Sequence, residues 1–427
     1  MPKTIALIAT LDTKGEEAQF VREQIESRGH RVVLVDPGTL GEPVVPADIT
    51  RDEVARAAGV PSIAEVRGWG NKQRAMETMV LGTTVVVTHL AQTGEIHGVI
   101  GIGGGAGTSI ATAAMRALPL GFPKLMVSTI AAGKHYFGTF MGIRDLTMMH
   151  SVADILGLNP IIRKVLANGA AAICGMAEVE LGIERGDRPL ILGTMFGTTT
   201  PCLMRAKAIL DQHGYEVVVF HPNGTGGPAM EELIEQGIGD AVLDLSAHEI
   251  SGHLFNDIMG APNRLEAAGK LGLPQVVGPG GNDFLVLGPP DEIPAEHRHR
   301  LAYRHTPEMT LCRVTAEEMV QVASVIAERL NRATGPAAVV VPLRGFSFPS
   351  REGHPLYDPE SDQAFARTIK EKLSERVQYV EVDCHINDPP YADTAVALLE
   401  ELIGRKPSSH RSAGFRSHDS LLGGKDR

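Results

Sequence analysis

Short apolar runs alternate with helical patterns along most of the chain. Residues 4–10 (TIALIAT) and 30–35 are rich in β-branched residues and predict buried parallel strands, and the segment between them predicts a helix that ends at Gly29. The same patterns predict a helix over about residues 72–91 and a strand over 124–128. This alternation is typical of an α/β fold with doubly wound parallel sheets built from right-handed βαβ units.

The second half of the chain repeats the first. One constant shift of 185 residues aligns Gly29 with Gly214, Val32 with Val217 and Pro37 with Pro222. The repeat predicts two Rossmann-like subdomains related by internal duplication, residues 1–184 and 185–405, which face each other across a cleft. Residues 406–427 are polar and rich in Gly and Ser, so we expect a disordered tail there.

The most distinctive stretch is VIGIGGGAG, residues 99–107, followed by an Ala-rich helical pattern. This order predicts a strand, then a glycine turn, then the start of a helix. Such a turn lets a ligand approach the free backbone N–H groups of the helix, and these groups favour an anion. A close strand–helix turn without a ligand is the alternative. Because three glycines in a row exceed the needs of a turn, we favour a phosphate or carboxylate cradle. Its expected residues are Gly103, Gly104, Gly105, Gly107, Thr108 and Ser109.

A second polar loop follows the first predicted strand. Asp12, Thr13 and Lys14 stand at the carboxyl end of that strand, where ligands bind in doubly wound folds. We expect Lys14 to neutralise phosphate charge and Asp12 to coordinate Mg²⁺ through water. Asp36 ends the next strand and is either a ribose-binding acid or a turn residue before Pro37.

The second half offers further candidates. The NGTGG loop at residues 223–227 is either a second anion cradle or a plain helix entry. Asp244, Ser246 and Glu249 either hold a metal or cap a helix. His305, His385 and Asp388 are the candidate acid–base residues, although an isolated histidine more often has a structural role.

Composition narrows the function classes. The formal net charge of −11 argues against a nucleic-acid-binding protein, and no apolar stretch has the length of a membrane span. The four cysteines, residues 174, 202, 312 and 384, are widely spaced, which favours reduced thiols over disulfides or a zinc knuckle. We therefore expect a cytoplasmic protein.

Several segments together resemble one known family. They include LDTKGEE, GIGGGAGTSIA, DLTMMHSVADILGLN, GTMFGTTTPC, FHPNGTGGPAMEELI and HINDPPYAD, which belong to matches spanning about residues 3–405. The chain is similar to the family of the ATP-binding N-terminal region of the tomato mosaic virus resistance protein, whose members are mostly bacterial. The resemblance implies two Rossmann-like subdomains, ATP with Mg²⁺, and a homodimer. The chain departs from the family at residues 131–134, where Lys134 replaces an expected Asp.

Two function classes follow from these observations. The first is a nucleotide-binding regulatory or interaction protein that holds phosphate on the glycine loop. The second is a metabolic enzyme that acts on a small carboxylate or phosphorylated sugar acid in the cleft, with His305, His385 and Asp388 as acid–base residues. The lack of a known catalytic signature favours the first class, whereas the abundance of His, Asn and Asp at predicted strand ends of the second half favours the enzyme.

Overall fold

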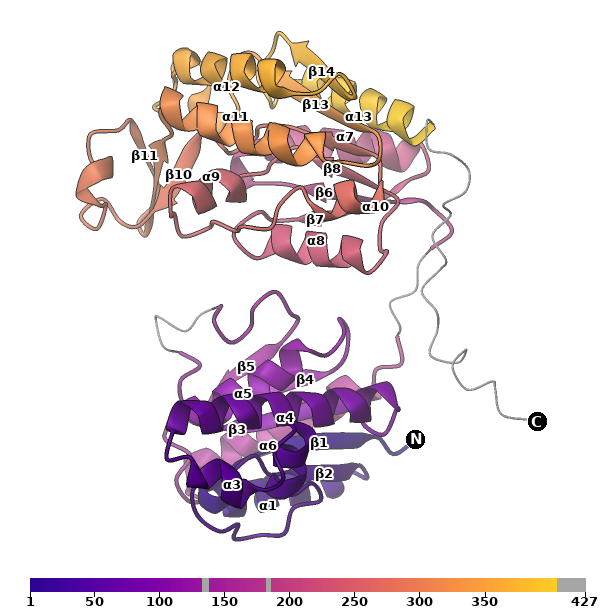
Figure 1. Ribbon diagram of the computed structural model, residues 1–427, viewed down its shortest axis with the longest axis vertical. Coiled ribbons are helices and arrows are strands. Elements are labelled where there is room, and N and C mark those ends of the chain that lie inside the picture. Colours follow the sequence, from indigo (N-terminus) through magenta and orange to yellow (C-terminus); the bar gives the residue numbers. More distant parts are fainter. Residues whose placement is uncertain (133–137, 182–185, 405–427) are drawn as a thin grey trace. The chain divides into compact units, whose positions relative to one another are not determined.

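Each half of the chain folds around a parallel β-sheet. The computed structural model describes residues 1–132, 138–181 and 186–404 (Figure 1). Its internal contacts divide the chain into two units, Met1–Glu184 and Arg185–Arg427. The predicted tail at 406–427 and Lys134 lie outside the described residues.

The sheet of the first unit has the order β2-β1-β3-β4-β5, with every neighbouring pair parallel. Its strands are β1 (Thr4–Ile8), β2 (Arg31–Val35), β3 (Gly98–Gly103), β4 (Lys124–Ser128) and β5 (Thr147–His150). Its helices are α1 (Leu11–Glu26), α2 (Arg51–Ala57), α3 (Ile63–Gly68), α4 (Lys72–Gln92), α5 (Gly105–Arg116) and α6 (Pro160–Glu178).

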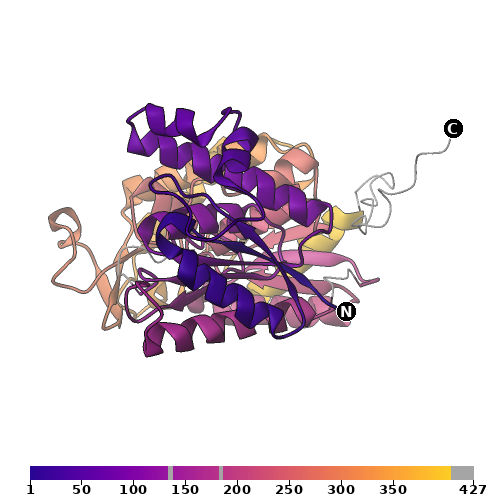
Figure 2. The same ribbon diagram turned by 90° about the horizontal axis from the view of Figure 1, so that it is seen from below.

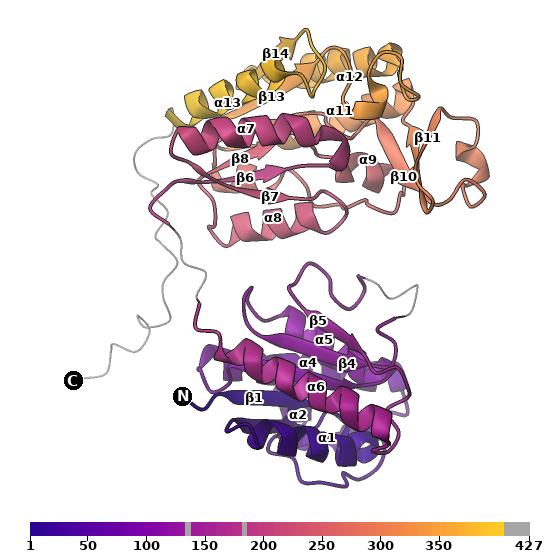
Figure 3. The same cartoon turned by 180° about the vertical axis from the view of Figure 1, so that it is seen from behind.

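Helices cover both faces of this sheet. Helices α4 and α5 lie on the face seen in Figure 1, and α1 and α6 lie on the face seen in Figure 3. Figure 2 shows the strands of this unit between the two helical layers. Strands buried on both faces explain why they read as nearly continuous apolar runs in the sequence.

The second unit repeats this topology and extends it. Its main sheet has the order β14-β13-β9-β8-β6-β7, again all parallel. The strands are β6 (Leu190–Thr194), β7 (Glu216–Phe220), β8 (Ala241–Asp244), β9 (Gln275–Val277), β13 (Ala337–Pro342) and β14 (Val377–Val382). The bounds of β7 stand 185 residues after those of β2, which matches the shift found in the sequence.

Helices also cover both faces of the second sheet. Helices α11 and α12 lie in front in Figure 1, and α7 and α13 lie in front in Figure 3. The helices are α7 (Thr200–Gln212), α8 (Gly226–Glu235), α9 (Glu249–Leu254), α10 (Ala267–Leu271), α11 (Ala316–Asn331), α12 (Pro359–Lys372) and α13 (Pro389–Gly404). Three short 3₁₀ helices are η1 (Gly197–Thr199), η2 (Ala295–His297) and η3 (Phe348–Ser350).

A small antiparallel sheet is inserted between β9 and β13. It has the order β10-β12-β11, with β10 (Phe284–Leu287), β11 (Ala302–Thr306) and β12 (Met309–Arg313). The described residues of the first unit contain no counterpart of this insertion, which was not predicted from the sequence.

Both units therefore have the predicted α/β, Rossmann-like architecture. None of the four cysteines forms a disulfide, and all four are buried. Among the helices of the described ranges, none combines the length and the apolar character needed to cross a bilayer.

Candidate functional site

The glycine loop lies where the strand order of the first sheet reverses. From β1 the chain passes to β2 on one side, and β3 then pairs with β1 on the other side, Ile8 standing opposite Gly101. Ligands of doubly wound folds bind at the carboxyl ends of the strands at such a point. The loops after β1 and β3 are the two segments on which the sequence predicted a site.

The structure requires glycine at some positions of the glycine loop and not at others. A Cβ on Gly101 would lie 2.6 Å from Ala111 Cβ, and one on Gly103 would lie 3.0 Å from Gly107 Cα, so these two permit close strand–helix packing. A Cβ on Gly105 would meet nothing within 4 Å. Packing of the strand against the helix therefore explains Gly101 and Gly103 but leaves the exposed Gly105 unexplained.

Within the described part of the chain, no side chain caps the start of α5. Gly104 is the N-cap residue and has no side chain that could accept hydrogen bonds from the helix. The first N–H groups of a helix lack an intrahelical partner and carry the positive end of the helix dipole. Gly105 and Ala106 are exposed there, so this end of α5 offers N–H donors to solvent or to an anion.

Two hydroxyls of the predicted cradle are directed elsewhere. Thr108 is fully buried, and its hydroxyl lies 2.7 Å from the Ser128 hydroxyl at the end of β4. The Ser109 hydroxyl donates to the Gly105 carbonyl at 3.0 Å. The Thr108 hydroxyl is therefore not available to a ligand at this loop. The reason is geometric, because Thr108 lies on the face of α5 that packs against the sheet.

The loop after β1 forms the first turn of α1 and is held by its own contacts. Oδ2 of Asp12 accepts hydrogen bonds from the N–H groups of Leu40 at 2.9 Å and Gly41 at 3.1 Å. The Thr13 hydroxyl lies 3.0 Å from that of Thr10. Lys14 interrupts the helical conformation (φ −130°, ψ 19°) and is half-buried, and its ammonium group has no hydrogen-bond partner among the described residues.

The contacts of Asp36 are those of a structural residue and not those of a ribose-binding acid. Its carboxylate accepts hydrogen bonds from the N–H groups of Leu11 and Gly38 and forms a buried ion pair with Arg51 at 2.7 Å. A carboxylate has about four acceptor sites. Two of the four donors come from Arg51 (Nε and Nη2), so little capacity remains for a ribose hydroxyl.

The NGTGG loop of the second unit is a filled anion cradle. Oε1 of Glu249 accepts hydrogen bonds from the N–H groups of Gly224 at 2.9 Å and Gly227 at 3.0 Å. The protein's own carboxylate thus occupies the N-terminal end of α8. Among the described residues no carboxylate accepts hydrogen bonds from the first N–H groups of α5, and this is the main difference between the two glycine loops.

Asp244, Ser246 and Glu249, for which the sequence left a metal site and a helix cap open, have partners within the protein. The Ser246 hydroxyl lies 2.6 Å from that of Thr199, and the two carboxylates hold a buried arginine. The Arg264 guanidinium contacts Asp244 at 2.7 Å, Glu249 at 2.5 Å and Glu231 at 3.0 Å, and its side chain is fully buried. Burial alone would lower the pKa of Arg264, but the three carboxylates raise it. No group of side chains in the described residues has the composition and spacing of a metal site.

The side chains of His385 and Asp388 hold the loop that follows β14 in place. His385 is 2% exposed; its Nε2 donates to the Ser347 carbonyl at 2.9 Å, and its Nδ1 accepts from the Asn387 N–H at 3.1 Å. Burial lowers the pKa of His385. An Nδ1 that accepts a hydrogen bond carries no proton, which is the arrangement of a neutral ring. Asp388 accepts the N–H of His385 and pairs with Arg351. With both ring nitrogens engaged, His385 has no free nitrogen for acid–base chemistry in this arrangement.

The third acid–base candidate lies on a different sheet. His305 is an exposed residue of β11 in the small antiparallel sheet, whereas His385 and Asp388 follow β14 of the main sheet. No contact between His305 and the other two is found in the described residues.

A buried histidine that the sequence did not single out lies beside a buried carboxylate. His248 is fully buried; its Nδ1 lies 2.6 Å from the Gly281 carbonyl and its Nε2 lies 3.1 Å from Oδ2 of Asp257. Burial lowers the pKa of His248, but Asp257 and the Gly281 carbonyl outweigh it, so the pKa is raised. Nδ1 has a hydrogen-bond acceptor, whereas Nε2 lies near Asp257 without the geometry of a hydrogen bond. The raised pKa favours the imidazolium form, which we take as the expectation to be tested.

This arrangement predicts a pH dependence of stability. A histidine whose folded-state pKa is raised stabilises fully below its unfolded pKa of about 6.5, and the contribution disappears as the pH rises through the folded value. We expect the free energy of unfolding of the wild type, measured relative to His248→Gln by urea denaturation, to fall above pH 6.5. A difference between the two proteins that stays constant from pH 6 to pH 9 would contradict the imidazolium assignment.

Comparison with known sequences agrees with the two-unit architecture. Residues 3–181 match the N-terminal domain, and residues 188–403 the C-terminal domain, of "Uncharacterised protein family (UPF0261)". A UPF0261 protein from Clostridium tetani is 42% identical over 405 residues, covering 94% of this chain and 99% of the relative. One from Rhizobium meliloti is 37% identical over the same coverage.

A plant protein is also related. The ToMV resistance protein Tm-1(GCR237) of Solanum lycopersicum is 32% identical over 430 residues, which cover 94% of this chain but 56% of the tomato protein. The match agrees with the resemblance seen in the sequence motifs. Both domain matches and these identities show that the chain belongs to the UPF0261 family.

Proposed function

We propose that the first unit binds a nucleotide, ATP, with its phosphates at the start of α5. The observation that carries the proposal is the uncapped end of this helix at the strand-order reversal between β1 and β3. The NGTGG loop of the second unit supports the proposal, because there the Glu249 carboxylate accepts hydrogen bonds from backbone N–H groups at the start of a helix. An anion is therefore a suitable partner for the corresponding N–H groups of α5.

Backbone groups supply the proposed phosphate contacts. The N–H groups of Gly105, Ala106 and Gly107 are the donors, and Gly104 keeps the approach to them free of a side chain. The resemblance to the family of the tomato protein's ATP-binding region supports ATP over other anions.

Charged side chains of the neighbouring loop complete the proposed site. Lys14 belongs to the loop after β1, the strand adjacent to β3, and its ammonium group is the cation proposed to approach the phosphates. Asp12 uses Oδ2 for the Leu40 and Gly41 amides, which leaves Oδ1 for a water ligand of Mg²⁺. Mg²⁺ commonly binds through one carboxylate, phosphates and water, so this residue fits that role.

Lys14→Ala tests the electrostatic part of the proposal. Loss of one charge-assisted contact of about 1.5–3 kcal/mol should weaken ATP·Mg²⁺ binding about tenfold to a hundredfold in calorimetry. Adenosine, which lacks phosphate, should not bind detectably. Lys164→Ala, an exposed lysine on α6, is the matched control and should bind like the wild type. Equal affinity of the wild type and Lys14→Ala for ATP would remove Lys14 from the site.

A further inference from the structure

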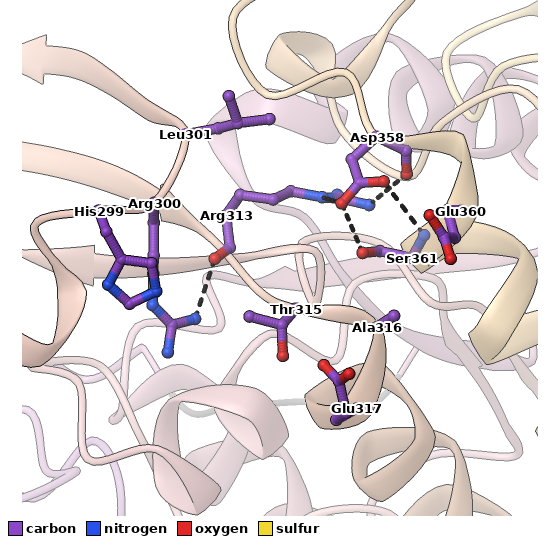
Figure 4. Close-up of a pocket in the computed structure, with 10 residues that line it drawn as sticks. All are labelled: His299, Arg300, Leu301, Arg313, Thr315, Ala316, Glu317, Asp358, Glu360 and Ser361. Atoms are coloured by element: carbon purple, nitrogen blue, oxygen red, sulfur yellow. Dashed lines mark hydrogen bonds and ion pairs between the residues drawn. The ribbon is translucent and has the colours of Figure 1, made fainter.

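One buried arginine attaches the small antiparallel sheet to the rest of the second unit. Arg313 is the last residue of β12, and its side chain is 2% exposed. Its guanidinium donates to the main-chain carbonyl of Asp283, just before β10, at 3.1 Å and to that of Asp358, just before α12, at 3.0 Å. Figure 4 shows the Arg313 side chain extending towards Asp358 along a pocket that both residues line. All of these residues belong to the second unit and are separate from the proposed nucleotide site.

Two buried carboxylates share this single cation. The guanidinium of Arg313 contacts Oδ1 of Asp362, on α12, at 2.5 Å and Oδ2 of Asp283 at 3.2 Å. We call these three side chains the Arg313 junction. Both aspartates are buried, Asp283 completely. The Asp358 carboxylate lies 3.8 Å from the guanidinium, but 29% of that side chain is exposed to solvent. When both buried aspartates are ionised, the junction therefore carries one negative charge more than its cation balances.

Hydrogen bonds do not compensate for the excess charge. Oδ2 of Asp283 accepts from the Ser347 hydroxyl at 2.5 Å, whereas Oδ1 is buried without a partner in the described residues. For the Asp362 carboxylate, Arg313 is the one hydrogen-bond donor found within the described ranges. A buried charge without enough partners is costly, and a carboxylate avoids the cost by binding a proton.

The charged groups on the adjoining elements do not supply the missing positive charge. Two ion pairs and one histidine lie around the junction, and they are Arg300 with Glu318, Arg351 with Asp388, and His385. The arginines are thus already paired. His385 accepts a hydrogen bond on Nδ1, which is the arrangement of a neutral ring. A proton on one of the two buried aspartates balances the junction.

Asp362 is the expected position of this proton. Burial raises the pKa of Asp362 to about 6, with Arg313 opposing the shift and Asp283 adding to it. An aspartate in an unfolded chain has a pKa of about 3.9. Because the folded-state value is the higher of the two, proton binding stabilises the fold fully below about pH 4. This contribution is lost as the pH rises through about 6.

We propose that the Arg313 junction is a pH-sensitive attachment of the small sheet to α12. When Asp362 holds a proton from solvent, the remaining charges of Asp283 and Arg313 balance and the attachment is strong. When the proton dissociates, the excess negative charge weakens the attachment. The segment from β10 to β12 therefore opens locally more often at pH 8 than at pH 5.

Asp362→Asn tests the proton uptake. The amide keeps the shape of the side chain and an oxygen that accepts from Arg313, but it does not titrate. From pH 8 to pH 5, the folding equilibrium constant of the wild type relative to the variant should rise about tenfold, as a pKa of about 6 against 3.9 requires. Urea denaturation of both full-length proteins measures this ratio, in which the contribution of His248 cancels. A ratio that is independent of pH would overturn the proposal.

Asp291→Asn is the matched control, because Asp291 is an exposed aspartate between β10 and β11. The ratio of the wild type to this variant should stay constant over the same pH range. A tenfold change here as well would show that the pH dependence does not come from the junction.

Hydrogen exchange tests the attachment itself. After correction for the intrinsic pH dependence of exchange, the amides of β10 and β12 should become several-fold better protected in the wild type from pH 8 to pH 5. In Asp362→Asn this gain should be absent. An equal gain in both proteins would show that proton uptake at Asp362 does not control the attachment of the small sheet.

Infrared difference spectroscopy gives a test that does not need the Asp362 variant to fold. In the wild type, the C=O band of a protonated carboxyl group should appear as the pH falls through about 6, above the range of exposed carboxyl groups. Asp283→Asn removes the neighbouring negative charge and should move this titration to lower pH. Absence of the band down to pH 5, or a titration that Asp283→Asn leaves unchanged, would overturn the proposal.

Discussion

Replacing Gly104 by Asp is expected to abolish nucleotide binding and to leave the protein at least as stable as the wild type. Gly104 is the N-cap of α5 with extended dihedral angles, and a Cβ there would meet only Thr129 Oγ1 at an ordinary 3.5 Å. An aspartate at this position caps the helix, which stabilises by about a few tenths of a kcal/mol relative to glycine. The same carboxylate occupies the N–H groups proposed for phosphate and repels it.

Opposite signs for affinity and stability make this prediction specific. Calorimetry with ATP·Mg²⁺ should show no saturable binding to Gly104→Asp, while the thermal unfolding midpoint is unchanged or higher. Gly104→Ala, which adds neither a cap nor a charge, is the matched control and should keep most of the affinity. Wild-type affinity in the aspartate variant would show that nucleotide does not bind at the start of α5.

The largest loss of stability is expected for Arg264→Met. This change leaves the carboxylates of Glu231, Asp244 and Glu249 buried without their shared cation. Removing one partner of a buried ion pair typically costs about 3–5 kcal/mol, because the remaining charge is uncompensated. Urea denaturation should show a decrease of at least this size in the free energy of unfolding.

An exposed arginine gives the comparison. Arg332 is 73% exposed and pairs with Glu328 one helical turn away, so Arg332→Met should change the free energy of unfolding by less than about 0.5 kcal/mol. If Arg264→Met cost as little as Arg332→Met, the three carboxylates would not depend on Arg264 for their charge balance.

The fold could be predicted from the sequence because its strands are buried on both faces. The predicted strand at 124–128 coincides with β4, and the predicted helix over about 72–91 corresponds to α4, Lys72–Gln92. Strand β5 escaped prediction because its residues, TMMH, form an edge strand without a β-branched apolar run. The small sheet β10-β12-β11 escaped because nothing in the repeat indicates an insertion.

The place of the candidate site could also be predicted, but not the partners of its side chains. Topology alone brings the loops after β1 and β3 to one edge of the sheet. Which side chains face inward depends on packing: Thr108 contacts Ser128, and Asp36 contacts Arg51. The sequence left open whether Glu249 serves a metal or a cap, and its actual partners, Arg264 and the NGTGG amides, lie 15 to 25 residues away.

The most direct test of the nucleotide site is a titration of the full-length protein, labelled with ¹⁵N at glycine, with ATP·Mg²⁺. We expect the amide resonances of Gly105 and Gly107 to shift saturably, because their N–H groups are the proposed phosphate donors. Those of Gly224 and Gly227, already held by Glu249, should not shift in this way. Saturable ATP binding that leaves the resonances of Gly105 and Gly107 unchanged would show that the phosphates do not bind at the start of α5.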